Sequence, residues 1–238
     1  MVRFIKRDTK ERKKMILDNN DRFDINEKMI PAEMAVTIEE AREVAAIFRD
    51  LRMRYIAAIK EISTKLEVLD NEYRLKHDYN PIHNMKARIK SVDSIIEKIG
   101  RKGWPMEVAS IYKITDFAGV RVICNYIDDI YTVENSLLRQ DDIKLIRRTD
   151  YIKNPKESGY RSLHLVVEVP IFLSDRTYNM PVEIQIRTIA MDTWASLEHE
   201  LKYKRKNAMP EYIAEELKRC AKSMAEIDAT MERIHKMY

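Results

Sequence analysis

The chain has 238 residues, of which 45% are hydrophobic and 34% are charged, and 43 basic against 39 acidic side chains leave a formal net charge of +4. This balance is typical of a globular protein with a highly charged surface and excludes a disordered chain. Only four glycines occur, where average usage gives about 17. The sequence lacks both G-x-G-x-x-G and G-x-x-x-x-G-K-[ST], so a Rossmann loop, a kinase glycine loop and a P-loop are excluded.

The two cysteines, Cys124 and Cys220, have no metal-ligand spacing and stand among 13 methionines. Free thiols of this kind are typical of a reducing compartment. No apolar run approaches the length of a membrane span, and the N-terminus lacks the apolar segment of a signal peptide. We therefore expect a cytoplasmic protein with no membrane or DNA partner.

Residues 1–36 have the composition of a basic N-terminal extension. Its first fourteen residues carry seven basic side chains and two acidic ones. Such a run is either a solvated tail or peripheral helix, or an arm that binds nucleic acid or a protein partner.

Residues 37–79 are expected to form one long helix or two. Thr37-Ile-Glu-Glu40 has the pattern of a capping box, and apolar residues follow in steps of three and four as far as residue 73. Asn80-Pro81 ends this block. Two shorter helices are expected, one over 88–99 with Ser91 as its cap and one over 106–117.

The hydrophobic period then changes from 3.6 to 2. Strands are predicted at 119–126, 143–149, 162–169 and 182–187, with a helix at 128–139 between the first two. Beyond Thr188 the helical period returns over 189–204 and 211–237. Helices therefore flank a central sheet, which gives an α+β domain.

The predicted strand 182–187 places Glu183, Gln185 and Arg187 on one side. His164 and Arg121 occupy alternate positions on other strands, so the strands are able to share one polar face. The alternative is an edge strand whose polar side faces water.

Two further segments carry groups suited to a nucleotide. Lys90, Ser94 and Lys98 have the spacing of one helix face, which suits a polyphosphate or is a solvated basic surface. The loop 150–164 places Tyr160 among the cations Lys153, Lys156 and Arg161. That composition fits base stacking with phosphate neutralisation, or a plain surface loop whose tyrosine packs down.

Asp116 directly precedes a predicted strand. It is able to join Glu183 on a Mg²⁺ ion, because hard cations prefer carboxylate oxygens. The plainer interpretation is a cap or turn residue.

Four segments together resemble the synthetase domain of the RelA/SpoT alarmone enzymes, in particular the stand-alone small alarmone synthetases. They are RIKSVDSIIEKI (88–99), ITDFAGVRVIC (114–124), DYIKNPKESGYRSLHL (150–165) and VEIQIRTIAMDTWASLEHELKYK (182–204). The resemblance covers roughly residues 38–235.

The resemblance implies transfer of the β,γ-pyrophosphate of ATP to the ribose 3′-hydroxyl of GTP or GDP, giving AMP and (p)ppGpp, with no hydrolase activity. It implies a mixed, nucleotidyltransferase-like sheet wrapped by helices, and a homotetramer. The synthetase domain would span 37–238: long helices over 37–79, a catalytic core over 80–204 and a C-terminal helix over 211–237.

Residue roles follow from the same resemblance. Asp116 and Glu183 would hold Mg²⁺, with Glu183 also the candidate base, and Gln185 would lie close to the reacting centre. The ATP-binding residues would be Arg88 and Arg121 around adenine, and Lys90, Ser94 and Lys98 on the phosphates. The GTP-binding residues would be Lys153, Lys156, Tyr160 (stacked on guanine), Arg161, His164 and His199.

A different class of function stays open beside this one. An RNA-binding regulatory module would use the same basic groove, with the basic extension as an additional contact. An inert helical assembly protein is a third interpretation, against which the Asp116 and Glu183 pair argues.

Overall fold

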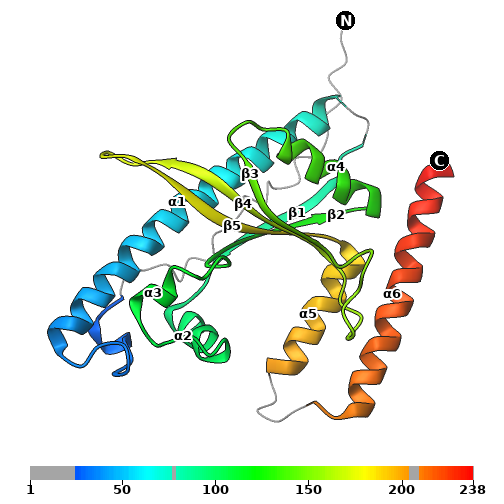
Figure 1. The fold of residues 1–238 in the computed structure, drawn as a ribbon. Helices are drawn as coiled ribbons and strands as arrows, with labels where there is room; N and C mark the ends of the chain where they lie inside the picture. Colours follow the sequence, from blue (N-terminus) through cyan, green and yellow to red (C-terminus); the bar gives the residue numbers. More distant parts are fainter. Residues whose placement is uncertain (1–24, 77–78, 204–208, 238) are drawn as a thin grey trace, which may run out of the picture.

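The computed structural model describes residues 25–76, 79–203 and 209–237. Within these ranges the chain folds into one five-stranded sheet surrounded by helices (Figure 1). The predicted α+β class is confirmed. The basic residues of positions 1–14 lie outside the described part, so the two interpretations of that segment stay open.

Three of the five strands follow one another in the chain, between helical segments. After a short 3₁₀ helix (Glu27–Met29), the elements are α1 (Ile38–Lys76), β1 (Ile82–Ile89), α2 (Val92–Arg101), α3 (Val108–Ile111), β2 (Ala118–Cys124), α4 (Ile127–Leu138), β3 (Lys144–Asp150), β4 (Leu163–Phe172), β5 (Thr177–Thr188), α5 (Ile189–Tyr203) and α6 (Glu211–Met237). The strand order is β1-β2-β5-β4-β3. β2 pairs parallel with β5 and the other pairs are antiparallel, so the sheet is mixed as expected.

The block 37–79 contains one 39-residue helix, α1, rather than two. Its capping box forms as predicted: the Glu40 amide donates to Thr37 Oγ1 at 3.1 Å, and the Thr37 amide donates to Glu40 Oε2 at 3.0 Å. These bonds satisfy amides that lack helical partners. None of the described helices combines the length and apolarity needed to cross a bilayer.

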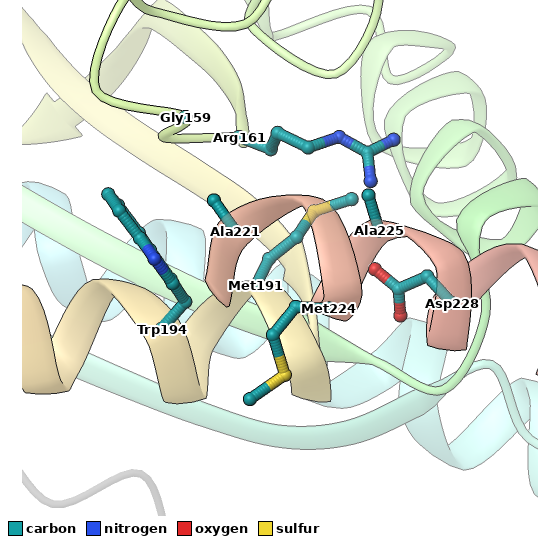
Figure 2. Close-up of a pocket in the computed structure, with 8 residues that line it drawn as sticks. All are labelled: Gly159, Arg161, Met191, Trp194, Ala221, Met224, Ala225 and Asp228. Carbon is teal, nitrogen blue, oxygen red and sulfur yellow. The ribbon is translucent and has the colours of Figure 1, made fainter. Parts of the chain in front are cut away.

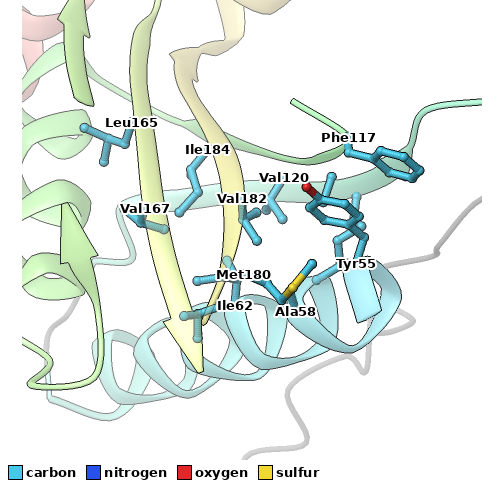
Figure 3. Packing of buried hydrophobic residues seen from close by; sticks show 14 of the residues in the cluster. Tyr55, Ala58, Ile62, Phe117, Val120, Leu165, Val167, Met180, Val182 and Ile184 are labelled. Atoms are coloured by element: carbon cyan, nitrogen blue, oxygen red, sulfur yellow. The ribbon is translucent and has the colours of Figure 1, made fainter. Parts of the chain in front are cut away.

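One face of the sheet is apolar and packs against α1 (Figure 3). From the helix, Tyr55, Ala58 and Ile62 face strand residues such as Val120 and Val182. Tyr55 also stacks on Phe117 with ring centroids 4.4 Å apart. Each fully buried large apolar side chain contributes roughly 1.5–3 kcal/mol, so this face holds the sheet in place and leaves the opposite face free for polar side chains.

Strand β1 is absent from the sequence-based prediction. A bulge between Ile82 and Asn84 breaks its register with β2, so the period of two is limited to Met85–Ile89, and the end of this short run was assigned to the helix predicted over 88–99. The helix predicted over 88–99 therefore begins only at Val92, after the predicted cap Ser91, whose side chain accepts from the Ser94 amide at 3.3 Å.

Two other predicted bounds were wrong. The helix predicted over 106–117 is reduced to the four residues of α3. β5 begins at Thr177 instead of residue 182 and contains Pro181. That proline is tolerated because β2 pairs with β5 only from Glu183 onward, so the segment before it has a single neighbouring strand.

The described end of the expected extension packs on α1. Ile25 and Ile30 belong to the buried core, and Arg49 Nη1 donates to the Ile25 carbonyl at 2.5 Å. Residues 25–30 therefore contribute to the same core as the sheet.

Candidate active site

The open face of the sheet carries the polar residues that the sequence singles out. Strand register aligns Gly119 with Glu183, and Arg121 with Gln185. His164 lies opposite Gln185 from the other side. Aligned residues of neighbouring strands share a face, so the predicted common polar face is confirmed and the edge-strand alternative is excluded.

Five side chains on this face form a closed circuit of contacts. Arg187 Nη2 donates to Tyr160 Oη at 2.6 Å and to Gln185 Oε1 at 2.5 Å. Gln185 Nε2 donates to Glu183 Oε2 at 2.9 Å. Tyr160 Oη bonds His164 Nε2 at 2.8 Å, and His164 Nδ1 lies 3.5 Å from Glu183 Oε1.

Two arms of this circuit join the guanidinium of Arg187 to the carboxylate of Glu183. One arm passes through Gln185, which accepts from Arg187 and donates to Glu183. The other passes through the Tyr160 hydroxyl, which accepts from Arg187, and through His164, whose Nδ1 faces Glu183.

Glu183 is held ionised by its surroundings. Burial on its own raises the pKa of this carboxyl, and so does the charge of Asp116. The hydrogen bonds from His164 and Gln185 outweigh both, so the pKa of Glu183 lies below its ordinary value. The interaction with Asp116 also means that the two candidate metal ligands are close enough to influence each other.

Asp116 lies between two lysines. Lys98 Nζ contacts Asp116 Oδ1 at 2.5 Å, and Lys90 Nζ contacts Oδ2 at 3.2 Å. Burial raises the pKa of Asp116, but Lys98 and Lys90 lower it by more than burial raises it, so the pKa lies below its ordinary value. Asp116 is therefore more than a cap: it is an ionised carboxylate in a cationic setting.

The predicted row of Lys90, Ser94 and Lys98 on one helix face was wrong in part. Lys90 precedes the Ser91 cap, so only Ser94 and Lys98 lie on α2. The ammonium groups of Lys90 and Lys98 nevertheless converge on one carboxylate. Ser94 Oγ accepts from Ser91 Oγ at 2.9 Å in the first turn of the helix.

Arg121 and Arg187 share an acid that the sequence-based site omits. Asp192, in the first turn of α5, accepts from Arg121 Nη1 at 3.1 Å and from Arg187 Nη1 at 3.4 Å. Burial, then the charge of Arg187, and also that of Arg88 lower the pKa of Arg121. Arg88, on β1, is thus close enough to act on Arg121, and the cations of three strands gather on this face.

The loop 151–161 brings aromatic rings to the edge of the circuit. Tyr151, Tyr160 and His164 meet edge to face, with centroids 5.2–6.0 Å apart. Lys156 Nζ lies 4.7 Å from the Tyr151 ring and 5.0 Å from the Tyr160 ring. An amphipathic platform of rings beside a cation is able to stack a base next to a phosphate.

Three predicted residues lie elsewhere. Lys153 Nζ lies over the Tyr131 ring at 5.4 Å. The Arg161 side chain points into a small pocket between α5 and α6 (Figure 2). His199 is exposed on α5.

Three residues of the site have no assigned role in the sequence-based prediction: Arg187, Asp192 and Tyr151. Arg187 shares the period of Glu183 and Gln185, so the alternation already pointed to it. Asp192 lies in the helix after the strand, and only the three-dimensional structure shows that it reaches back to two arginines.

Asp150 anchors the start of this loop. Its Oδ1 accepts from the amides of Ile152 and Lys153, both at 3.0 Å, and its Oδ2 accepts from Tyr131 Oη at 3.2 Å and from Arg148. Burial raises the pKa of Asp150, but these amides and then Arg148 lower it more, so it lies below its usual value.

Replacing Asp150 with alanine is expected to lower the free energy of unfolding at pH 7 by about 1 kcal/mol, because exposed and part-buried donors lose their charged acceptor. A carboxyl whose folded-state pKa is lowered stabilises the fold above its unfolded pKa of about 4, and this contribution decreases as pH falls from there through the folded-state pKa. Urea unfolding of wild type and D150A at pH 7 and pH 3 measures both. D141A, which removes an exposed carboxylate before β3, is the control, and a difference as large at pH 3 as at pH 7 would contradict the charge argument.

This chain is similar to known proteins over most of its length. The family described as "Region found in RelA / SpoT proteins" matches residues 87–208. GTP pyrophosphokinase YwaC of Bacillus subtilis (strain 168) is 41% identical over 206 residues, covering 86% of this chain and 98% of that protein. GTP pyrophosphokinase YjbM of the same strain is 38% identical over 180 residues, covering 76% and 84%.

Solved structures agree with the fold. Small alarmone synthetase 2 from Bacillus subtilis gives a TM-score of 0.74 at 41% identity, covering 80% of this chain and 99% of that one. Small alarmone synthetase 1 from the same organism, bound to its product pppGpp, gives 0.73 at 38% identity, covering 77% and 93%. The site combines two ionised carboxylates with arginines and lysines on a mixed sheet, which is typical of proteins that bind phosphate groups. This chain belongs to the RelA/SpoT family, among its small alarmone synthetases.

Proposed function

We propose that this chain is a GTP/GDP 3′-pyrophosphokinase, which transfers the β,γ-pyrophosphate of ATP to the ribose 3′-hydroxyl of GTP or GDP and releases AMP and (p)ppGpp, without hydrolase activity. The observation that carries the proposal is the ionised Glu183 at the end of both arms of the circuit, close to Asp116 between two lysines. Relatives named GTP pyrophosphokinase support it. Transfer of this kind needs positioning and charge neutralisation more than covalent catalysis.

The ATP side of the site would be formed by β1, β2 and α2. Arg88 and Arg121, on paired strands, would hold adenine between their planar guanidinium groups. Lys90 and Lys98 would bind the phosphates by charge-assisted hydrogen bonds, with Ser94 beside them. A relative, small alarmone synthetase 1 from Bacillus subtilis, has been solved bound to AMPCPP.

The acceptor side would be formed by the loop 151–161 and β4. Tyr160 would stack on guanine, with Lys156 and His164 near the acceptor phosphates and ribose. Glu183, ionised and hydrogen-bonded, would accept the proton of the 3′-hydroxyl. Gln185 would hold that carboxylate in place through its 2.9 Å bond.

Asp116 and Glu183 fit a magnesium ion. Mg²⁺ takes one or two carboxylates together with substrate phosphates. The described residues contain no group of three or more histidine, cysteine or acidic ligands, so phosphate oxygens would complete the coordination. When bound, Mg²⁺ supplies charge neutralisation and polarisation of the phosphates.

The function is tested by incubating the protein with labelled ATP, Mg²⁺ and either GTP or GDP. The expected products are AMP and a guanosine nucleotide carrying a 3′-pyrophosphate, and EDTA is expected to abolish both. If no product forms with either acceptor while the protein retains labelled RNA on a filter, the RNA-binding module replaces the enzyme as the function.

Two variants of Tyr160 distinguish the stacking of its ring from the hydrogen bonding of its hydroxyl. Y160A is expected to raise the KM for GTP roughly 5- to 150-fold, since stacking on an aromatic ring contributes about 1–3 kcal/mol per base, with the KM for ATP unchanged. Y160F keeps the ring and loses the bond to His164, so its KM for GTP is expected to stay near wild type while kcat falls. Steady-state kinetics with each nucleotide varied in turn measures this, and a KM for GTP unchanged in Y160A would contradict stacking.

A homotetramer and a cytoplasmic location complete the proposal. On α6, Ile227, Met231 and Ile234 are 52%, 46% and 52% exposed, which is an apolar row suited to contact between copies. The two cysteines are unpaired, as a reducing compartment requires. Light scattering of purified protein tests the assembly.

A further inference from the structure

Helix α6 contacts the loop 151–161 at the residue directly before Tyr160. Gly159 has φ +88°, and a Cβ placed there would lie 2.5 Å from Ala221 Cβ. The loop is closed by two bonds: the Gly159 amide donates to the Lys156 carbonyl at 2.8 Å, and the Lys156 amide donates to the Tyr160 carbonyl at 3.1 Å. Only glycine allows this turn and this close approach.

On the far side of Tyr160, Arg161 reaches toward the same helix. Figure 2 shows its guanidinium directed toward Asp228 across the small pocket that Met191 and Met224 also line. Arg161 Nη1 is buried without a hydrogen-bond partner among the described residues. Asp228 is 7% exposed. Burial is the largest influence on its pKa and raises it, while the charge of Arg161 is among the influences that lower it.

Asp228 also holds the end of β5. Its Oδ2 accepts from Thr188 Oγ1 at 2.8 Å, and Thr188 Oγ1 accepts from the Met191 amide at 3.1 Å, in the first turn of α5. The residue before Thr188 is Arg187, the origin of the circuit. Asp228 therefore lies near two residues, Arg161 and Thr188, that directly follow Tyr160 and Arg187 in the chain.

We propose that Asp228 is a positioning residue for the acceptor nucleotide: it fixes Arg161 and Thr188, and through them the side chains of Tyr160 and Arg187. This inference rests on the proposed function. Other charges around Asp228 are few: Glu232, on the same helix, acts on it electrostatically, as Arg161 does from the loop. Removing its charge takes the nearby acidic charge from Arg161, whose Nη1 is buried; this is unfavourable, so the loop is expected to move.

The test replaces Asp228 with asparagine, which is still able to accept from Thr188 and loses only the charge. D228N is expected to raise the KM for GTP about tenfold, which corresponds to 1.4 kcal/mol, with the KM for ATP within twofold of wild type and a smaller fall in kcat than in Y160F. E226Q is the matched control: it removes one acidic charge from an exposed position of the same helix and is expected to change nothing. A uniform loss of kcat, or no change in the KM for GTP, would overturn the proposal.

Hydrogen exchange gives a readout that does not depend on turnover. The amides of Lys156 and Gly159 are expected to exchange at least tenfold faster in D228N than in wild type, while amides of the central strands β2 and β5 stay unchanged. If wild type makes no product, the proposed enzyme function fails, and this exchange measurement still tests the coupling of α6 to the loop. If wild type is active and neither KM nor exchange responds, only the role of Asp228 fails.

R161M covers the case in which D228N fails to fold. Its flexible apolar side chain is able to lie along Met191 and Met224, and it is expected to reproduce the rise in the KM for GTP. In the double variant R161M/D228N no further rise is expected, because Asp228 acts through Arg161. A rise in R161M with none in D228N, or effects of the two changes that add, would instead mean that Arg161 binds the nucleotide directly, and would overturn the proposal.

Discussion

Replacing Glu183 with glutamine is expected to lower kcat by about a thousandfold or more. The amide is unable to accept the proton of the 3′-hydroxyl, and general-base contributions alone reach about 10²–10⁴. It also removes one of the two carboxylates that fit magnesium. Glutamine keeps the size of the side chain, and Gln185 and His164 are able to remain in place, so nucleotide binding is expected to change far less than turnover.

The measurement is kcat for AMP release at saturating ATP and acceptor, together with a thermal melt to show that the variant is folded. E168Q is the matched control. Glu168 lies on β4, and its carboxylate pairs with Lys144 at 3.6 Å, largely exposed on the lysine side; such a pair contributes little. D116N is expected to lose turnover as well. Retention of a tenth of wild-type kcat in E183Q would contradict the role of Glu183 as base.

The polar face could be predicted because a strand has a strict period of two. Glu183, Gln185 and Arg187 therefore had to point the same way. The alternation does not predict strand register. Only the pairing of β2 and β4 with β5 in the structure shows that Arg121 and His164 lie beside Gln185. Strand β1 was missed for a local reason, because the bulge at its start limits the alternation to Met85–Ile89.

Tyr160 and Arg161 are consecutive in the chain, but their side chains are directed to different parts of the structure. The role of Arg161 in GTP binding stays a prediction. In the structure Tyr160 joins the circuit and Arg161 turns toward α6. The sequence shows neither the partner of Thr188 nor the acid near Arg161, because Asp228 lies 40 residues beyond the strand on a helix whose packing face is set by tertiary contacts.

Arg187 is the residue on which the whole arrangement depends, although it carries no assigned role in the sequence-based site. It is 4% exposed and donates to Tyr160, Gln185 and Asp192. A guanidinium matches this number of acceptors because it presents five donors in a fixed plane. Its charge is balanced by Asp192 directly and by Glu183 through the two arms.

R187M is therefore expected to lower the free energy of unfolding by about 1–3 kcal/mol, since Tyr160 and Gln185 lose their charged donor while Asp192 keeps its bond from Arg121. R187K keeps the charge and loses the fork, so it is expected to recover part of the stability and little of the turnover. Urea unfolding at pH 7 measures the first effect, and kcat measures the second. R176M removes an arginine from an exposed pair with Asp175 and is expected to leave the unfolding midpoint unchanged. If R187M were as stable as R176M, the circuit would be a set of separate contacts that do not depend on the guanidinium.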